Sequence, residues 1–330
     1  MIITFKKKTM KRTVLFAAAA ALLLFGACQK DGKYNPKEKI AKVYEEVSNS
    51  YSYNDGEGWQ TETNGTPKHV TEQWTWDGKK LSQIAYPSYD YDDEGNMVLD
   101  GDQDVLRFTY DGSQLTEVTA NYDFRMVFTY DGKKLQKAEV YDEKTTPDFV
   151  YEFEHDGKKI SAITMTIDES IYDKKYASVS RMEKLLLGNI IPQSKTTEKV
   201  MRELHAKAAK STQSIKMNLT WDGDNVSKIT AVTPYGGNAT MSFTYDDKNN
   251  PFKGFGLMFG DYGESGTGVE FCNKNNITKI VLSDLDGDTE EESYTYTYDG
   301  KWPVSRSQES SYSSTNEQYS WKVTEYFEYE

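Results

Sequence analysis

The chain is poor in the residues on which most catalytic and metal sites depend. Its 330 residues include 3 histidines and 2 cysteines. The histidines, His69, His155 and His205, share no metal-ligand spacing, so we expect neither a zinc site nor a histidine-based triad. No glycine-rich loop stands between a strand and a helix, which argues against the common nucleotide-binding folds. The sequence therefore predicts a protein that is not an enzyme and needs no cofactor.

Basic residues are scarce relative to acidic ones, with 39 Lys and Arg against 52 Asp and Glu and a net charge of −13. Because nucleic-acid binding needs a positive surface, DNA and RNA are not expected as partners. A mean hydropathy of −0.74 is too polar for a multi-span membrane protein, whereas 13% aromatic residues is too many for a disordered chain. The 24 Tyr and 23 Gly favour strands and tight turns over helices.

The long apolar run, residues 14–25, follows five basic residues and ends in Gly26-Ala27-Cys28. It is too short to span a bilayer comfortably, and small residues directly before a cysteine resemble the site cut by the lipoprotein signal peptidase. We expect residues 1–27 to be a signal peptide, Cys28 to carry the lipid, and residues 28–34 to be a tether. The alternative is an ordinary secretory peptide or an uncleaved anchor. Cleavage before Cys28 would take the net charge from −13 to −18.

These features predict a lipoprotein of the outer membrane, on its periplasmic face or on the cell surface. Lipidation of Cys28 leaves Cys272 as the other cysteine, so no intramolecular disulfide is expected. We expect Cys272 to be a small buried residue of a strand.

A short motif recurs along the chain and explains most of its length. An aromatic residue or histidine precedes Asp-Gly, and apolar residues follow about five and eight positions after the aromatic one. Clear copies contain Trp76, Tyr110, Tyr130, His155 and Trp221, and degenerate copies begin at Tyr245, Asn273 and Tyr298. Alternating aromatic and Thr residues predict a strand with one buried face, and Asp-Gly supplies the positive φ angles of a tight reversal. Each copy is predicted to be one β-hairpin with a bulge at the start of its return strand.

The spacing between neighbouring copies, such as Tyr110 and Tyr130, leaves room for two strands and two turns but for no crossover helix. Successive hairpins should therefore pair antiparallel, as a meander. We expect an all-β domain over residues 52–330, with about fourteen to eighteen strands curled into an open or partly closed barrel. Because the turns carry lysine pairs, we do not expect this barrel to span the membrane.

Two segments depart from the repeat and are predicted to be helical. Asn35-Pro36 resembles a cap and first-turn proline, and an apolar stripe begins at Ile40, so a short N-terminal helix is expected over residues 35–51. Residues 173–213 contain apolar residues at helical spacing and are expected to form a helical insertion. This insertion would either cover the barrel mouth or bind a partner.

The signal segment, the Asp-Gly-Lys-Lys-Leu turns, and the late pair Pro251-Phe252 and Asn275-Asn276 together resemble two groups of proteins. One is the YD-repeat class, and the closer one is an uncharacterised Bacteroidetes lipoprotein family with a porin-like, incompletely closed barrel. The resemblance covers most of residues 70–305. It implies a fold and an envelope location, and it implies no activity or catalytic residue.

Acidic loops are weak candidates for a metal site. Asp284, Asp286 and Asp288 alternate as calcium ligands do, but Thr289 stands where a calcium loop needs its turn glycine. A solvated hairpin turn is the commoner explanation, and the same holds for a second acidic cluster between Asp90 and Asp104.

Aromatic residues outside the repeat positions, such as Trp59 and Trp302, are weak candidates for ligand binding because flat rings stack on sugars. We therefore expect a non-enzymatic, lipid-anchored envelope protein that binds a glycan or an envelope protein. Two alternatives stay open: a glycan-degrading hydrolase that uses paired carboxylates, and a purely structural lipoprotein.

Overall fold

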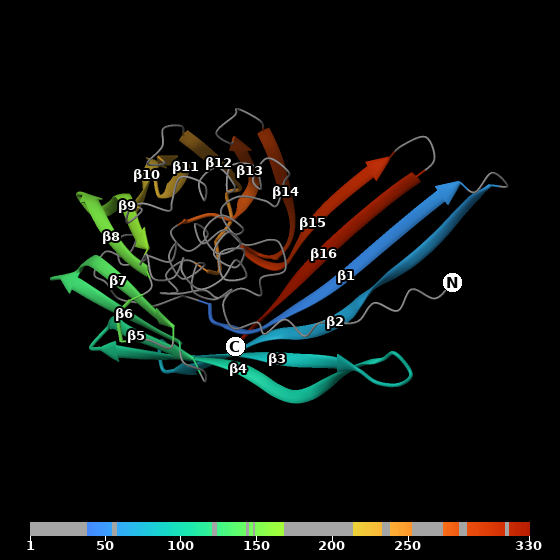
Figure 1. The fold of residues 1–330 in the computed structure, drawn as a ribbon, viewed down its shortest axis with the longest axis horizontal. Helices are drawn as coiled ribbons and strands as arrows, with labels where there is room; N and C mark the ends of the chain where they lie inside the picture. Colours follow the sequence, from blue (N-terminus) through green and yellow to red (C-terminus); the bar gives the residue numbers. More distant parts are fainter. Residues whose placement is uncertain are drawn as a thin grey trace.

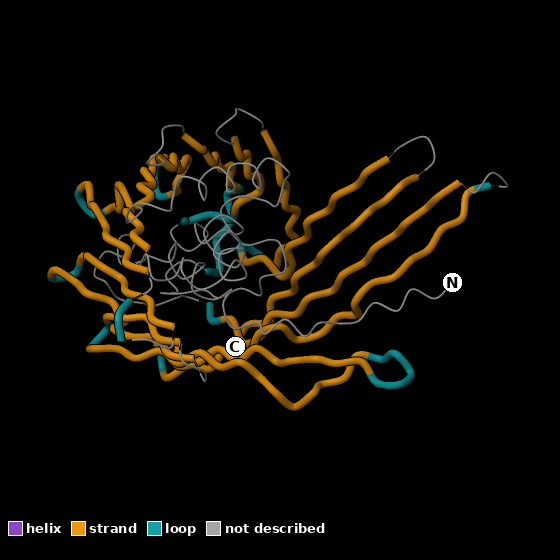
Figure 2. Tube along the Cα trace, viewed as in Figure 1, coloured by secondary structure: helices purple, strands orange, loops and turns teal. Residues whose placement is uncertain are grey.

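The computed structural model describes residues 38–54, 58–120, 124–142, 145–147, 149–167, 214–232, 238–252, 273–283, 289–313 and 317–330. Every regular element in these ranges is a β-strand, and Figure 2 accordingly shows only strands and loops in the described chain. The predicted helical insertion, residues 173–213, lies outside the described residues.

The described strands form one closed antiparallel barrel in which each strand pairs with its neighbours in sequence and the first pairs with the last (Figure 1). The strands are β1 (Ile40–Asn54), β2 (Trp59–Asp77), β3 (Lys80–Tyr91), β4 (Met97–Asp111), β5 (Gln114–Ala120), β6 (Phe124–Asp131), β7 (Lys134–Asp142), β8 (Phe149–Asp156), β9 (Lys159–Ile167), β10 (Ser214–Asp222), β11 (Asn225–Val232), β12 (Asn238–Tyr245), β13 (Ile277–Ser283), β14 (Thr289–Asp299), β15 (Trp302–Ser313) and β16 (Glu317–Tyr329). The meander predicted from the repeat is confirmed, and these sixteen strands fall within the expected number.

The N-terminal helix predicted over residues 35–51 is wrong for its described part. Residues 40–54 form β1, which pairs with β16 on one side and with β2 on the other. The spacing of the apolar residues resembled that of a helix because the strand is irregular. Its register with β16 shifts between Ile40 and Lys42, and this places Ile40 and Val43 on the same buried face although they are three residues apart. β1 is the strand that closes the barrel, so the expectation of an open or partly closed barrel is wrong as well.

The Asp-Gly turns have the geometry that the sequence predicts. Gly132, in the turn between β6 and β7, has a φ of 57°, in the left-handed region that glycine enters without strain. The register of this hairpin shifts between Thr129 and Tyr130, which pair with Lys137 and Leu135, so Gln136 is the extra residue of a bulge. The bulge expected at the start of the return strand is therefore confirmed.

In five copies of the motif, the aromatic residue or histidine ties its hairpin to an earlier part of the wall. The phenol of Tyr130 donates a hydrogen bond to the backbone carbonyl of Leu115 at 2.8 Å. The same pattern joins Trp76 to Ile40, His155 to Leu135, Trp221 to Ile160 and Tyr245 to Val226. Tyr, Trp and His all combine a ring with a donor at its tip, whereas Phe has no donor, which explains which residues occupy the position.

The two faces of the barrel wall differ in polarity. On the inner face, apolar side chains from nearly every strand, among them Val118 and Met126, form one buried cluster. On the outer face, charged side chains pair with one another across strands, as Lys216 does with Glu154 at 2.6 Å. Further outer pairs join Lys279 to Glu291 and Lys322 to Glu309. A transmembrane barrel has the opposite arrangement, with an apolar band on its outside.

Four neighbouring strands leave the wall together and form a projection that we call the wing (Figure 1). It consists of residues 47–54 of β1, 59–66 of β2, 309–313 of β15 and 317–323 of β16, which pair with one another in register. The neighbouring strands β14 and β3 do not follow the wing, because their pairing with β15 and β2 ends at Gln308 and Gln73.

A separate hairpin extends beside the wing. Residues 86–104 of β3 and β4, which we call the arm, pair with each other, and β4 pairs with β5 only from Leu106 onward. Tyr89 of the arm connects it to β2, because the tyrosine hydroxyl donates to the carbonyl of Val70 at 3.0 Å.

The Asp-Gly turns lie at the opposite end of the barrel, together with the first and last described residues. Glu330 donates its backbone N–H to the carbonyl of Lys39 at 2.9 Å, and the two side chains form an ion pair at 2.8 Å. We call this end the turn rim.

Candidate ligand-binding site

Four aromatic side chains share one face of the wing. The register places Tyr51 opposite Tyr319, and Tyr53 and Trp321 stand two residues further along their strands, on the same face. Tyr51 and Tyr53 stack with their ring centroids 5.6 Å apart and their planes at 27°. We call Tyr51, Tyr53, Tyr319 and Trp321 the aromatic face. Tyr51 and Tyr319 are 38% and 40% exposed, so these rings are accessible to a ligand.

Polar groups stand between these rings. Asn49 lies opposite Trp321 in the register, and Asn64 of β2 lies opposite Asn49. The side-chain oxygen of Asn49 has no hydrogen-bond partner, and Glu317 accepts a hydrogen bond from the hydroxyl of Tyr51 at 3.2 Å. The face thus combines aromatic rings with amide and carboxylate groups that can bind hydroxyls.

A hollow of about 640 Å³ lies over the middle of the wing. Trp321 and Asn49 line it together with small residues such as Ser310 and Ser320. Most of the lining residues, among them Ser50, Ser320 and Lys322, pair on the face opposite the aromatic face, so the hollow lies outside that face.

A row of charged residues crosses the inner face where the wing joins the barrel. Successive strand pairs place Arg306 opposite Glu325, Glu325 opposite Glu45, and Glu45 opposite His69. Arg306 is almost fully buried, and its Nε donates to Glu325 at 2.5 Å. Among the described residues, Glu45 and Glu325 face each other on neighbouring strands, as the paired carboxylates of the hydrolase alternative would.

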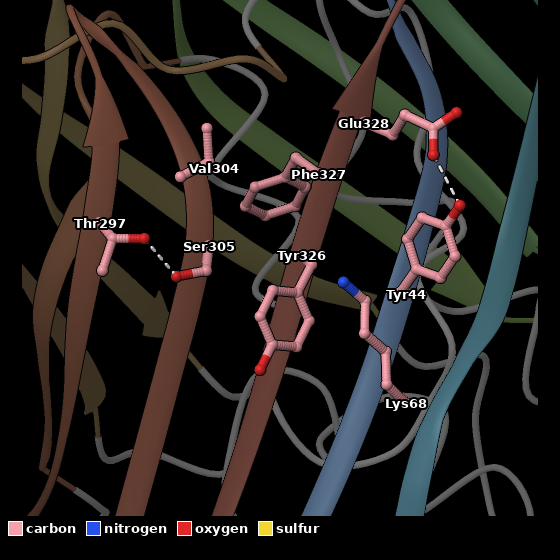
Figure 3. Close-up of a pocket in the computed structure, with 8 residues that line it drawn as sticks. All are labelled: Tyr44, Lys68, Thr297, Val304, Ser305, Tyr326, Phe327 and Glu328. Atoms are coloured by element: carbon pink, nitrogen blue, oxygen red, sulfur yellow. Dashed lines mark hydrogen bonds between the residues drawn. The ribbon is translucent and has the colours of Figure 1, made fainter.

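A second hollow, of about 500 Å³, lies on the outer wall and is shown in Figure 3. The ammonium of Lys68 lies 3.9 Å from the ring centroid of Tyr326 and 4.8 Å from that of Tyr44. The hydroxyl of Tyr44 donates to Glu328 and that of Tyr326 donates to Glu46, both at 2.6 Å. Each hydrogen bond to a carboxylate raises the pKa of its phenol. Because its own lysine covers both rings, this hollow fits a ligand less well than the aromatic face does.

A cluster of polar groups around Asp246, at the turn rim, forms hydrogen bonds that hold neighbouring loops together. The carboxylate of Asp246 accepts backbone N–H groups from Lys248 and Asn276, both within 3.1 Å, and also the hydroxyl of Tyr298. Burial and the hydrogen bond to Asp246 raise the pKa of Tyr298. These groups close the loops that follow β12 and precede β13, so we assign them no ligand.

The structure separates the two tryptophans that the sequence singled out. Trp59 is 46% exposed, as expected, but it pairs with Asn54 and so lies on the face of the wing opposite the aromatic face. Trp302 lies at the turn rim, half-buried, with its ring centroid 6.3 Å from that of Tyr329. The two residues stand at opposite ends of the molecule and cannot share one ligand.

The other predicted site residues lie apart. Cys28, Cys272, His205 and the calcium candidates Asp284, Asp286 and Asp288 are outside the described residues. Asp92, in the second acidic cluster, accepts backbone N–H groups from Glu94 and Asn96 at 3.0 and 2.8 Å, which lowers its pKa. Its carboxylate therefore holds the tip of the arm.

Within the described ranges, no group of three or more His, Cys, Asp or Glu side chains could hold a metal ion. The part of the chain that the structure describes contains no helix with the length and apolarity needed to cross a membrane.

The aromatic face was not predicted from the sequence because Tyr51 was the last residue of the predicted helix, residues 35–51. The signal that could have found it is the strand period, since Tyr51 and Tyr53, like Tyr319 and Trp321, are separated by one small polar residue.

No protein-family model and no curated protein sequence matches the chain. Among solved structures, it is similar to a porin-like protein from Bacteroides uniformis, with a TM-score of 0.47 and 11% identity over 90% of this chain and 100% of that one. A porin-like protein from Bacteroides vulgatus gives a TM-score of 0.40 and 12% identity, over 89% and 99% of the two chains. At this level of similarity, the function has to be inferred from the chain's own residues.

Proposed function

We propose that the protein is a lipid-anchored, non-enzymatic protein of the bacterial envelope. In this proposal the outer wall of its barrel faces water rather than lipid, and the aromatic face binds a glycan. The charges on the outer wall support its contact with water. Lys216 and Glu154 pair on that wall while Met217, next in sequence, is buried inside. Lipid contact would leave such charges without water, at a cost of about 2 to 4 kcal/mol for each lysine near the bilayer centre.

The position of residue 38 determines how a lipid on Cys28 would orient the barrel. Residue 38 lies at the turn rim, beside the ion pair of Lys39 and Glu330. Glu38 lies ten positions after Cys28, a length that reaches at most about 35 Å when extended. A lipid on Cys28 would hold the turn rim near the membrane and turn the wing away from it, where a glycan could reach it.

The single observation that carries the glycan proposal is the composition of the aromatic face. Tyrosine and tryptophan offer rigid, flat contact area at a small cost in side-chain entropy, and such rings stack on the apolar faces of sugars. The amides of Asn49 and Asn64 and the carboxylate of Glu317 stand among the rings and can bind sugar hydroxyls. Because Glu62 and Glu317 also flank the rings, we propose a neutral glycan rather than an acidic one.

A glycan-array screen with the full-length protein, followed by titration of tryptophan fluorescence, tests this proposal. Trp321→Ala should abolish binding of a glycan found on the array, because it removes a ring of the aromatic face. Trp59→Ala is the matched control, since it removes the same side chain from the opposite face of the same sheet. Loss of binding in Trp59→Ala alone would move the site to the other face, and no binding to any glycan would refute the proposal.

The hydrolase alternative rests on the facing glutamates Glu45 and Glu325 and has a separate readout. Release of reducing ends from a bound glycan, lost in Glu45→Gln, would show catalysis and overturn the non-enzymatic assignment. Binding without release supports the proposal as stated.

A further inference from the structure

One edge of the wing carries unpaired backbone groups. β2 pairs with β1 from Trp59 to Gln73, but its pairing with β3 covers only residues 73–77. Among the described residues, no strand therefore stands beside residues 59–71 on the side away from β1. Alternate residues of a strand direct their N–H and C=O groups to each side, so residues 59–66 of this edge offer a row of donors and acceptors to an added strand, whereas the carbonyl of Val70 already binds Tyr89.

The outer half of this edge lacks the features that usually block strand addition. Proline, lysine and bulges protect natural edges. Residues 67–71 have all three. Pro67 and Lys68 lie in this segment, and its pairing with β1 is interrupted by two register shifts, one before Tyr44 and one after Glu45. Residues 59–66 have none of them: they pair regularly with residues 47–54, and residues 59–65 are all exposed.

The arm, which extends beside the wing on the side of β2, is strongly acidic (Figure 1). The arm carries seven acidic residues between Asp90 and Asp104, and the chain has no Lys or Arg between Leu81 and Leu106. The arm and β2 meet at the ring contact between His69 and Tyr89, with centroids 5.0 Å apart, and diverge from there (Figure 1). Exposed apolar side chains accompany these charges, with Leu99 64% exposed.

We propose that residues 59–66 of β2 accept an extended, basic segment of a partner protein as an added strand, and that the acidic arm binds its lysine or arginine side chains. Main-chain hydrogen bonds to the free edge supply affinity that does not depend on the partner's sequence. The charge of the arm supplies selectivity, because it attracts a basic strand and repels an acidic one. The edge consists of backbone groups of β2, whereas the rings of the aromatic face come from β1 and β16, so strand addition extends the function beyond glycan binding.

The test uses the full-length protein and a fluorescent peptide in which lysine alternates with valine, long enough to cover residues 59–66. The peptide should bind, and hydrogen exchange should slow at the backbone amides of residues 59–66. A version with N-methylated alternate amides keeps its charge but cannot complete the ladder, so its affinity should fall by at least about tenfold. Equal binding of both peptides, or binding without protection of residues 59–66, would overturn the proposal.

Charge variants test the role of the arm. Asp93→Asn, Glu94→Gln and Asp102→Asn together should weaken binding of the lysine peptide by about tenfold or more. The matched control is Glu152→Gln, Glu154→Gln and Glu291→Gln, which removes the same charge from the outer wall and should leave the affinity unchanged. Equal losses in both variants would reduce the effect to net charge and overturn the role of the arm.

Two further outcomes also overturn the proposal. Absence of peptide binding does so directly. Protection of residues 59–66 that rises with protein concentration in the absence of peptide, together with a dimer in sedimentation, would assign the edge to a second copy of this chain. Neither outcome affects the glycan assay, so the two proposals fail independently.

Discussion

The phenol of Tyr130 and the backbone carbonyl of Leu115 lie 2.8 Å apart and join two successive hairpins of the barrel. Leu115 immediately precedes Thr116, the extra residue of the bulge in its return strand, and Tyr130 of the next motif binds the Leu115 carbonyl. Burial raises the pKa of Tyr130, so its phenol keeps the proton that it donates. The repeat therefore encodes both a hairpin and its attachment to the preceding one.

Tyr130→Phe should destabilise the barrel by about 1 to 3 kcal/mol, because the carbonyl of Leu115 loses its partner while the ring still fills its place. Urea unfolding of the full-length protein measures this difference. Tyr319→Phe is the control, since its exposed hydroxyl should contribute little. Equal stability of Tyr130→Phe and the unmodified protein would mean that the ring alone explains the motif.

Gly132→Val should cost about 1 to 3 kcal/mol, because a β-branched residue is strained at a positive φ. Lys133→Ala in the same turn should cost little, since it leaves the backbone conformation free. Thermal unfolding of both variants distinguishes a requirement of the backbone from a requirement for charge. Small, equal shifts for both variants would contradict the role of glycine in this turn.

The hairpins could be predicted because their determinants are local. Asp-Gly fixes the turn, and the alternation around Tyr110 and Tyr130 fixes the buried face. Closure could not be predicted in this way. β1 has no complete copy of the motif, because Asn54 rather than an aromatic residue precedes Asp55-Gly56. Its bulge gives Ile40 and Val43 a helix-like spacing, and its partner β16 lies at the far end of the sequence. The strand state of β1 is decided by these distant partners rather than by its own pattern.

The candidate site was harder to predict than the fold for a related reason. Aromatic residues in this chain serve mainly as core, and Tyr51 and Tyr319 differ from these by their exposure. Exposure depends on where the wing leaves the wall, and that point is set by the pairing of β14 with β15 and of β2 with β3. The sequence contains no local signal for these limits.

Acid should loosen the tip of the arm before it unfolds the barrel. The backbone N–H groups of Asn96 and Glu94 stabilise the ionised carboxylate of Asp92 and lower its pKa. A lowered pKa in the folded state means that this stabilisation is complete above the usual Asp range and is lost as the pH falls through the lowered value. The protection factors of the Glu94 and Asn96 amides, measured by NMR and corrected for intrinsic exchange at each pH, should therefore fall only at acidic pH.

Asp92→Asn is the control for this transition, because its side-chain oxygen accepts the same hydrogen bonds without titrating. The variant should show no acid transition at Glu94 and Asn96. A transition in the unmodified protein centred above the usual Asp range would contradict the assignment to Asp92.

Cys28→Ser should prevent labelling by an alkyne fatty acid and release the protein from membranes or leave it unprocessed, because the lipid would be its attachment. The charges on the outer wall lead to a second prediction, which concerns the solubility of the barrel. Once the leader and the lipid are absent, the barrel should remain in solution without detergent, since ion pairs such as that of Lys279 and Glu291 are compatible with water and not with lipid. Metabolic labelling and sedimentation in detergent-free buffer measure the two effects separately. A mature protein that carries no label would refute the anchor, whereas a labelled protein whose released barrel sediments with membranes would refute the assignment of its outer wall to water.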